Sequence, residues 1–339
     1  MKKRNASLDI FRIIAALLVI LIHFSGNYFP QVAYVFGKIV VPIFMMITGY
    51  FFFRKVQRLG IGEETDRYIR ATSIKILQLI IFWSILYIPL AITELHDKSL
   101  LVIVAYLLRS VWGINMFVGP AWYLISVLWG LNFVYYFMKH TKMVVPNIVG
   151  IIGLLVGIMT TYYGNWLNDF PSLAKGVEFV YPACSLLIGI SWITLSFYLV
   201  KYKERLDYLA RGWIIVLLFI CGELELLLVR HYHLVFKDTY DVSFTAVVLA
   251  PLVFLWILNH NFNVGSQTLQ LLKRLSALFY FTHLMVGDII IHCLEQSSLQ
   301  LTHLTEYLLI VLAVTIVSFV YLGLMKLTKW QLLNIGLGE

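Results

Sequence analysis

The chain has 339 residues, of which 60% are hydrophobic and only 13% are charged, and its mean hydropathy is +0.85. Soluble globular domains contain about 25% charged residues, so this composition excludes a soluble globular protein. The apolar runs are continuous and about 20 residues long, as transmembrane helices require, whereas a membrane β-barrel needs alternating segments of about 10 residues. We therefore expect an all-α integral membrane protein.

About ten segments are apolar and long enough to be transmembrane helices. They are residues 8–27, 34–53, 72–93, 121–138, 144–163, 176–200, 212–230, 240–258, 275–293 and 305–325. A further apolar run, residues 100–118, is interrupted by Arg109 and Gly113. We expect it to lie at the outer interface or to be re-entrant, because a crossing there would move every later loop to the opposite side. Residues 1–339 then form a single transmembrane domain.

Basic residues are distributed unevenly between the two sets of loops. With the N-terminus inside, 18 Lys and Arg residues lie on the inner side and six on the outer side. This bias is what the positive-inside rule predicts when both termini are cytoplasmic. It also accounts for the formal net charge of +8 without a nucleic-acid partner.

The first predicted span contains three polar residues, Asp9, Arg12 and His23. A charged residue at the centre of a transmembrane helix costs roughly 2.5 to 3.5 kcal/mol, so Arg12 needs a partner, a wet cavity or a place near the interface. Asp9 lies three residues earlier and can pair with it. Helical geometry places Arg12 and His23 on one face, roughly 16 Å apart along the axis. Because Asp9 and Arg12 interrupt the apolar run, we expect an uncleaved helix rather than a signal peptide.

Two arginines, Arg67 and Arg70, lie at the cytoplasmic start of the third predicted span. At i and i+3 they share a helix face. Such a pair can bind the phosphates of a ligand bidentately, and it can equally contact lipid headgroups.

Two glutamates, Glu223 and Glu225, lie near the middle of the seventh predicted span. They are about 200° apart around the helix, so they cannot both face one cavity. A charged residue at membrane depth indicates a functional site by default, and the alternative is a structural ion pair with a buried cation such as Lys75.

The ninth predicted span carries a polar stripe of Ser276, Tyr280, His283 and Gly287, spaced by four, three and four residues. This spacing places all of them on one helix face. A single His in a span is often only an interhelical hydrogen-bond donor, but Tyr280 and His283 together favour a polar cavity.

Motifs of several other enzyme classes are missing from the sequence. It has no glycine-rich phosphate loop, no HExxH and no GxSxG, which argues against an ATPase, a zinc protease and a serine hydrolase. The three cysteines, Cys184, Cys221 and Cys293, lie singly in predicted spans. They indicate neither a disulfide framework nor a metal site.

Taken together, these residues resemble the acyltransferase-3 family of multipass membrane acyltransferases. The resemblance covers nearly the whole chain, and its most specific part is D-x-x-R followed by R-x10-H. Asp9, Arg12 and His23 in the first span carry this motif. Further matching stretches are PIFMMITGYFFF with Thr48 and Tyr50, the R-x-x-R of Arg67 and Arg70, AWYL with Trp122 and Tyr123, and LFYFTHLMV with Tyr280 and His283. Thr48 stands where Ser is commoner in the family, and the proline usual soon after R-x-x-R is missing.

The resemblance implies an enzyme that transfers an acyl group, often acetyl, from a coenzyme A thioester to a hydroxyl of a sugar or other acceptor. It accordingly implies acetyl-CoA, or another acyl-CoA, as the co-substrate on the cytoplasmic side, with no metal. The acceptor is expected to be an envelope glycan or its precursor, and the location the plasma membrane of a bacterium. No hydrolase-like domain follows the last predicted span, so the chain resembles the stand-alone members of the family.

Within this scheme His23 is the candidate general base, because His is the side chain whose ordinary pKa lies nearest neutral pH. Arg12 would orient the donor or fix His23, with Asp9 as its charge partner. Arg67 and Arg70 would bind the phosphates of the donor. Supporting roles are expected for Thr48, Tyr50, Trp122, Tyr123, Glu225, Tyr280 and His283.

Two other classes of function compete with this interpretation. The membrane half of certain serine racemases resembles the same family and is thought to handle serine import, so a serine or small-solute transporter is the alternative. Arg12, His283 and the two glutamates would then line a permeation route. Against a transporter, the sequence has no Gly- or Pro-broken spans at matching places in two halves. A purely structural protein would leave the cost of the isolated charges unexplained.

Overall fold

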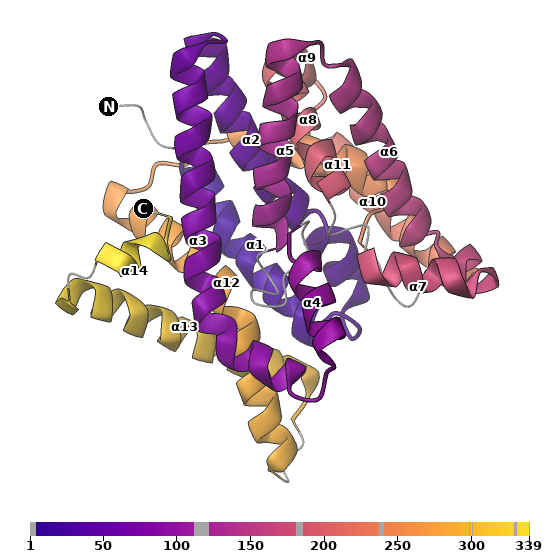
Figure 1. The fold of residues 1–339 in the computed structure, drawn as a ribbon, viewed down its shortest axis with the longest axis vertical. Coiled ribbons are helices and arrows are strands. Elements are labelled where there is room, and N and C mark those ends of the chain that lie inside the picture. Colours follow the sequence, from indigo (N-terminus) through magenta and orange to yellow (C-terminus); the bar gives the residue numbers. More distant parts are fainter. Residues whose placement is uncertain are drawn as a thin grey trace.

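A computed structural model of the chain describes residues 5–111, 122–180, 186–236, 241–297, 299, 301–328 and 331–338. Every regular element within these ranges is a helix, and the helices form one bundle (Figure 1). The sequence therefore predicts the fold class correctly, as an all-α protein.

The longer helices follow the order of the predicted spans. They are α1 (Ala6–Ser25), α2 (Val40–Leu59), α3 (Glu63–Leu95), α5 (Trp122–His140), α6 (Val144–Thr160), α8 (Leu186–Lys201), α10 (Gly212–His231), α11 (Phe244–Asn259), α12 (Ser266–Gln296) and α13 (His303–Thr328). The shorter ones are a π-helix (Val32–Gly37), α4 (Leu100–Arg109), a 3₁₀-helix (Asn165–Asp169), α7 (Pro171–Val180), α9 (Lys203–Leu206) and α14 (Gln331–Ile335). Each predicted span overlaps one of the longer helices.

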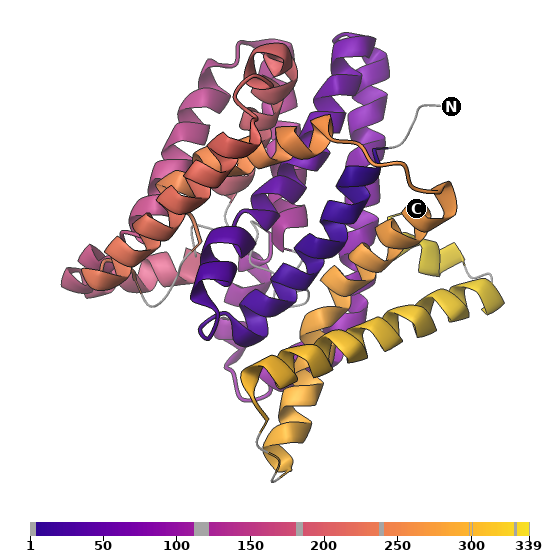
Figure 2. The same ribbon diagram turned by 180° about the vertical axis from the view of Figure 1, so that it is seen from behind.

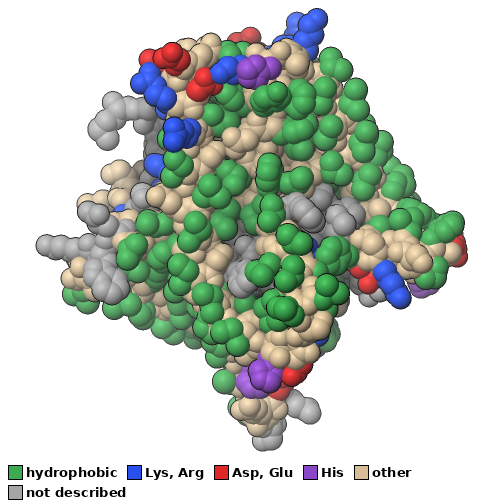
Figure 3. Space-filling model, in the orientation of Figure 1, with side chains coloured by type: hydrophobic (Ala, Val, Ile, Leu, Met, Phe, Trp, Pro, Cys, Tyr) green, Lys and Arg blue, Asp and Glu red, His purple; other side chains and the backbone are tan. Residues whose placement is uncertain are grey.

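The bundle has the surface of a multipass membrane protein. Six helical segments of the described chain are long and apolar enough to cross a membrane: α1, residues 32–59 and 63–93, α10, α12 and α13. Helices α4, α6, α8 and α11 are apolar but shorter. Hydrophobic side chains cover most of the face in Figure 3, and most charged side chains on it gather where α2 ends and α3 begins.

Two predicted segments differ from the helices that form. Residues 176–200 are not one span, because α7 lies across the end of the bundle and α8 runs along it (Figure 1). Pro171 begins α7, since Pro is favoured at the first helical position, and α7 packs against the preceding 3₁₀-helix. Within residues 100–118, the described part forms only α4. At about 1.5 Å per residue this helix is too short to cross a bilayer.

Small residues set the closest helix crossings. A Cβ at Gly189 of α8 would overlap the Ser126 carbonyl of α5, and a Cβ at Gly49 of α2 would lie 2.7 Å from Ser196 of α8. Small side chains at such crossings let helix backbones approach closely, which is the usual way that membrane helices pack. Helix α8 therefore sits against both α2 and α5.

Helix α1 packs alongside α12, near the middle of the view in Figure 2. Its start is hydrogen-bonded to the end of α11 and the chain that follows: the Asn5 amide donates to Leu258 O (3.0 Å), and the Ala6 N–H donates to Asn261 Oδ1 (2.8 Å). The C-terminal segment also folds back on the bundle, since Trp83 Nε1 donates to Gly336 O (3.0 Å). These contacts fix the walls of the cavity beside α1.

The α5–α8 crossing predicts the effect of one added methyl group. Gly189→Ala would overlap the Ser126 carbonyl, so we expect overpacking to lower the free energy of unfolding by about 1–3 kcal/mol. The measurement is the thermal unfolding midpoint of the purified chain in lipid nanodiscs. Gly176→Ala in α7, where a Cβ meets nothing within 4 Å, is the control and should not lower the midpoint. Equal destabilisation by both substitutions would contradict the crossing.

Candidate active site

The polar residues of α1 are paired as the sequence predicts. Arg12 donates from NH1 to Asp9 Oδ1 at 3.0 Å, one turn earlier, and the Asp9 side chain is only 2% exposed. A buried carboxylate at this depth requires a cation beside it. The Asp9–Arg12 pair therefore explains how both charges persist in an apolar helix.

A cavity of about 310 Å³ opens beside Arg12. It lies between α1, α2, α3, α5, α12 and the C-terminal segment. Its polar and charged lining residues are Arg12, Thr48, Lys75, Tyr123, Lys273, Ser276 and Tyr280. Three of these are cations and none is acidic. Arg12 is already paired with Asp9, so the positive charge that the described wall offers to an anionic ligand comes mainly from Lys75 and Lys273.

Three aromatic rings close one end of this cavity. Phe44 lies 5.6 Å from Tyr280 and 6.2 Å from Tyr123, and Tyr123 lies 5.1 Å from Tyr280, all between ring centroids. All three rings line the cavity, and Tyr280 also lies 6.0 Å from the His283 ring. Tyr280, one member of this aromatic trio, therefore lies beside both the cavity and the His283 ring.

His23 of α1 and His283 of α12 form a ring pair, with centroids 5.2 Å apart. His283 is fully buried, whereas His23 is exposed. Helices α1 and α12 approach closely here because Gly287 has no side chain; a Cβ at this position would overlap the Phe24 ring. The pair marks the point at which an accessible His meets the interior of the bundle.

The hydrogen bonds of His283 fix its tautomer. Its Nδ1 lies 2.8 Å from Tyr280 O and 3.2 Å from Phe279 O. Carbonyl oxygens only accept, so Nδ1 carries the proton and Nε2 of the neutral ring is an acceptor. This buried Nε2 has no hydrogen-bond partner among the described residues. A buried acceptor without a partner is costly, and an N–H or O–H group brought beside it would satisfy it.

The cavity and the ring pair bring together six of the predicted site residues, and the others lie elsewhere. Thr48 lines the cavity, with its hydroxyl donating to Phe44 O (3.2 Å), while Tyr50 lines a different pocket. Trp122 packs partly buried against the core. Arg67 and Arg70 are exposed in the first turns of α3 and do not line the cavity. Ala121 of the AWYL stretch lies outside the described residues.

Glu225 has a structural environment of its own. Its carboxylate accepts from the Phe244 and Thr245 N–H groups, each at 2.9 Å, and from the Tyr163 hydroxyl at 3.1 Å. These amides open α11, so the carboxylate caps that helix and is stabilised by the positive end of its dipole. The hydrogen-bonding capacity of the Glu225 carboxylate is thus met by a helix N-terminus and the Tyr163 hydroxyl, and no salt bridge to Lys75 forms between these described residues.

A family model described as an acyltransferase domain matches residues 5–323, nearly the whole chain. The chain belongs to the acyltransferase-3 family. No curated protein and no solved structure matches it in two further comparisons. Membership identifies the chain as a multipass membrane acyltransferase, and nothing in the comparisons supports the alternative of a transporter.

The cavity and the histidine pair also have charged neighbours that the sequence analysis did not name as site residues. Lys75 and Lys273 line the cavity, although the sequence suggested Lys75 only as a partner for a glutamate. Lys273 precedes Ser276 by three residues, so the polar stripe of α12 could have been extended to it. Lys38 and Asp241 form an ion pair within electrostatic range of His23. They are 203 residues apart, and no sequence spacing indicates such a contact.

The described ranges of the acyltransferase contain no group of three or more His, Cys, Asp or Glu side chains that could hold a metal ion. Cys221 and Cys293 are free, and Cys184 lies outside these ranges.

The capping role of Glu225 predicts a loss of stability on substitution. In Glu225→Gln a charge-assisted hydrogen bond to the α11 amides is lost, so we expect the free energy of unfolding to fall by roughly 1.5–3 kcal/mol. The unfolding midpoint in nanodiscs measures this. Glu223→Gln, on the same helix but without those amides, is the matched control. A larger loss in the Glu223 variant would show that the capping interaction is not what matters.

Proposed function

We propose that this acyltransferase is an O-acyltransferase, which moves an acetyl group from acetyl-CoA at the cytoplasmic side to a hydroxyl of a cell-envelope carbohydrate or related acceptor. The observation that carries this proposal is the position of the His23–His283 pair, because Tyr280 both lines the cationic cavity and lies 6.0 Å from the His283 ring. Family membership supports the reaction class. The cavity and the histidines support the division into a donor side and a reaction side.

The phosphates of the acetyl-CoA donor would lie in the cavity beside Arg12. Arg12, Lys75 and Lys273 are the cations that line it, and charge-assisted hydrogen bonds from such side chains to phosphate are stronger than neutral ones. Arg67 and Arg70, exposed at the start of α3, would attract the donor from the cytoplasm by charge alone. The thioester arm would then extend along α1, past the aromatic trio, toward His23.

The chemical step would use His23 as general base. The acceptor hydroxyl loses its proton to a ring nitrogen of His23 while its oxygen attacks the thioester carbonyl carbon. The new C–O ester bond forms, the C–S bond breaks, and the thiolate of coenzyme A takes the proton back from His23. A positioned base contributes about 10²–10⁴ in rate.

His283 would act as a positioning residue. Its Nδ1 proton is held by backbone carbonyls, which leaves Nε2 as an acceptor facing no described partner. If Nε2 accepts an N–H from His23, the other nitrogen of the His23 ring keeps a lone pair for the acceptor hydroxyl. The ring separation of 5.2 Å between centroids suits such a contact.

Removing the base tests the proposed reaction. We expect His23→Ala to lower acyl transfer by about 10²–10⁴, measured with radiolabelled acetyl-CoA and hydroxyl acceptors in nanodiscs. His96→Ala, with a side chain 79% exposed, is the control and should retain wild-type activity. Solute transport that survives His23→Ala, with no label on any acceptor, would favour a transporter instead.

Removing cations from the cavity tests where the donor binds. We expect Lys75→Gln/Lys273→Gln to raise the KM for acetyl-CoA about tenfold or more, since each charge-assisted hydrogen bond is worth roughly 1.5–3 kcal/mol. The KM for S-acetylpantetheine, which lacks the nucleotide, should not change. Arg67→Gln/Arg70→Gln removes the same charge outside the cavity and should raise the KM less. The reverse order of the two double variants would place the phosphates at Arg67 and Arg70.

A further inference from the structure

The cavity beside Arg12 has one described wall that is not part of a transmembrane-length helix. Most of its lining residues belong to α1, α2, α3, α5 and α12, but Leu337 and Gly338 lie in the turn that follows α14. This turn comes after residues 5–323, the part of the chain that the family model matches. Residues 331–338, which we call the C-terminal strap, thus add a wall to a cavity that the matched region otherwise lines.

The C-terminal strap lies beside the two helices that supply the cationic wall. Helix α14 packs on α3 and lies near the beginning of α12 in both views (Figures 1 and 2). Lys75 of α3 and Lys273 of α12 line the cavity together with the strap. A Cβ at Gly338 would lie 4.0 Å from Leu79 Cδ2, one turn along α3 from Lys75. The strap therefore ends next to a charge that would attract an anionic ligand.

The exposure of its residues places the strap at the mouth of the cavity. Gly338 and Lys75 are exposed, whereas Leu337 and Ser276 are buried. Gly338 thus forms part of the rim, while the Leu337 side chain fills part of the interior. The volume left beside Leu337 is about 310 Å³, near the lower limit of roughly 300–1,000 Å³ for ligand pockets. Moving Leu337 outward would enlarge the cavity and widen its mouth.

Two hydrogen bonds from side chains of the bundle hold the strap in place. Trp83 Nε1 donates to Gly336 O at 3.0 Å, and the Tyr321 hydroxyl donates to Leu333 O at 2.7 Å. The strap also packs closely, because a Cβ at Gly336 would overlap both the Tyr321 hydroxyl and the Phe82 ring. These contacts are few and local, so a single substitution can loosen them.

The strap is the wall of the cavity that can be displaced at the lowest cost. Helix α14 has five residues, far fewer than a helix needs to be stable on its own. The turn after it is held by N–H groups of Leu337 and Gly338 that donate to Asn334 O and Ile335 O. The other described walls belong to helices of 19 to 33 residues. Short segments with few hydrogen bonds open locally more often than long packed helices.

We propose that the C-terminal strap is a lid of the cavity beside Arg12, which releases Leu337 to admit an anionic ligand and then closes over it. The positive charge of Lys75 and Lys273 defines the ligand as an anion. The proposal concerns entry into the cavity, so it holds whether or not the ligand is the acyl-CoA donor proposed above.

The test measures how fast a water-soluble anion reaches the interior of the cavity. Ser276 lines the cavity and is 5% exposed, so Ser276→Cys places a thiol inside. The three native cysteines are replaced by Ser in this parent chain. The purified full-length parent in lipid nanodiscs is treated with the anionic reagent 2-sulfonatoethyl methanethiosulfonate, and mass spectrometry follows the labelling of the thiol.

Two substitutions in the parent release the strap, and a third is the matched control. Tyr321→Phe removes only the hydroxyl that donates to Leu333 O, and Gly336→Ala adds the Cβ that overlaps Tyr321 and Phe82. In the control, Tyr307→Phe, the same change is made on the same helix. The Tyr307 hydroxyl donates to Leu17 O of α1 at 3.4 Å and does not contact the strap. Unfolding midpoints show which variants fold, and Tyr321→Phe alone decides the test if Gly336→Ala does not.

We expect Tyr321→Phe to raise the labelling rate about fivefold, since losing one net hydrogen bond shifts the closed–open equilibrium by about that factor. Gly336→Ala should raise the rate at least as much, and Tyr307→Phe should leave it unchanged. A rate that stays at the parent level in Tyr321→Phe would overturn the lid and show a fixed wall. Equal acceleration in Tyr307→Phe would also overturn it, because general loosening of the bundle would then explain the labelling.

Discussion

The ion pair between Asp9 and Arg12 is the constraint on which the position of the other site residues depends. Asp9 is buried in an apolar helix, and a charge at that depth persists only beside an opposite one. The pair follows directly on Asn5 and Ala6, which are hydrogen-bonded to the end of α11 and the chain after it. Helix α1 is thereby fixed at one end, and Arg12 lines the cavity.

From that fixed end, α1 runs along α12 until two further polar groups meet. Gly287 lets the Phe24 ring approach α12, and the preceding residue of α1, His23, lies against His283. Backbone carbonyls of the same helix accept from one nitrogen of His283, Nδ1. Among the described residues, the bundle therefore holds a buried acceptor nitrogen, His283 Nε2, beside an accessible His.

The hydrophobic and polar periodicity of each segment predicted the helices. It could not predict the site residues that are brought together by contacts between segments distant in the sequence. Arg12 with Asp9, and Tyr280 with Ser276, follow from helical periodicity, because those partners lie within one helix. Lys75 lines the cavity because α3 packs beside α12 and α5, and no spacing within the sequence indicates that packing. In the sequence, Glu225 has no neighbouring cation that could be recognised as its partner. In the structure, its carboxylate accepts from the first backbone N–H groups of α11. The α7–α8 boundary was missed because an amphipathic helix at the bundle end is apolar enough to extend a span.

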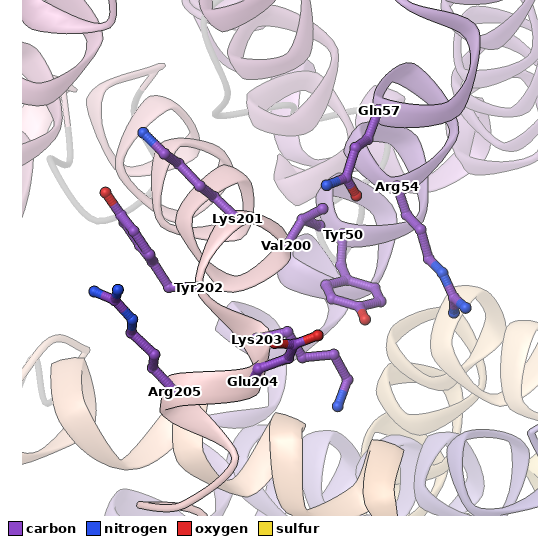
Figure 4. A pocket seen from close by; sticks show the side chains of 9 residues that line it. All are labelled: Tyr50, Arg54, Gln57, Val200, Lys201, Tyr202, Lys203, Glu204 and Arg205. Atoms are coloured by element: carbon purple, nitrogen blue, oxygen red, sulfur yellow. The ribbon is translucent and has the colours of Figure 1, made fainter.

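Three successive residues of α2 have different surroundings. Thr48 lines the cavity beside Arg12, Gly49 packs on Ser196 of α8, and Tyr50 lines a separate pocket (Figure 4). Three successive residues point in directions about 100° apart, so together they contact three different environments around one helix turn. Gly49 leaves no free space between α2 and α8, and packed interiors transmit displacement instead of absorbing it. The packing of Gly49 on α8 therefore holds Thr48 in the wall of the cavity beside Arg12 and directs Tyr50 to another face of the same helix.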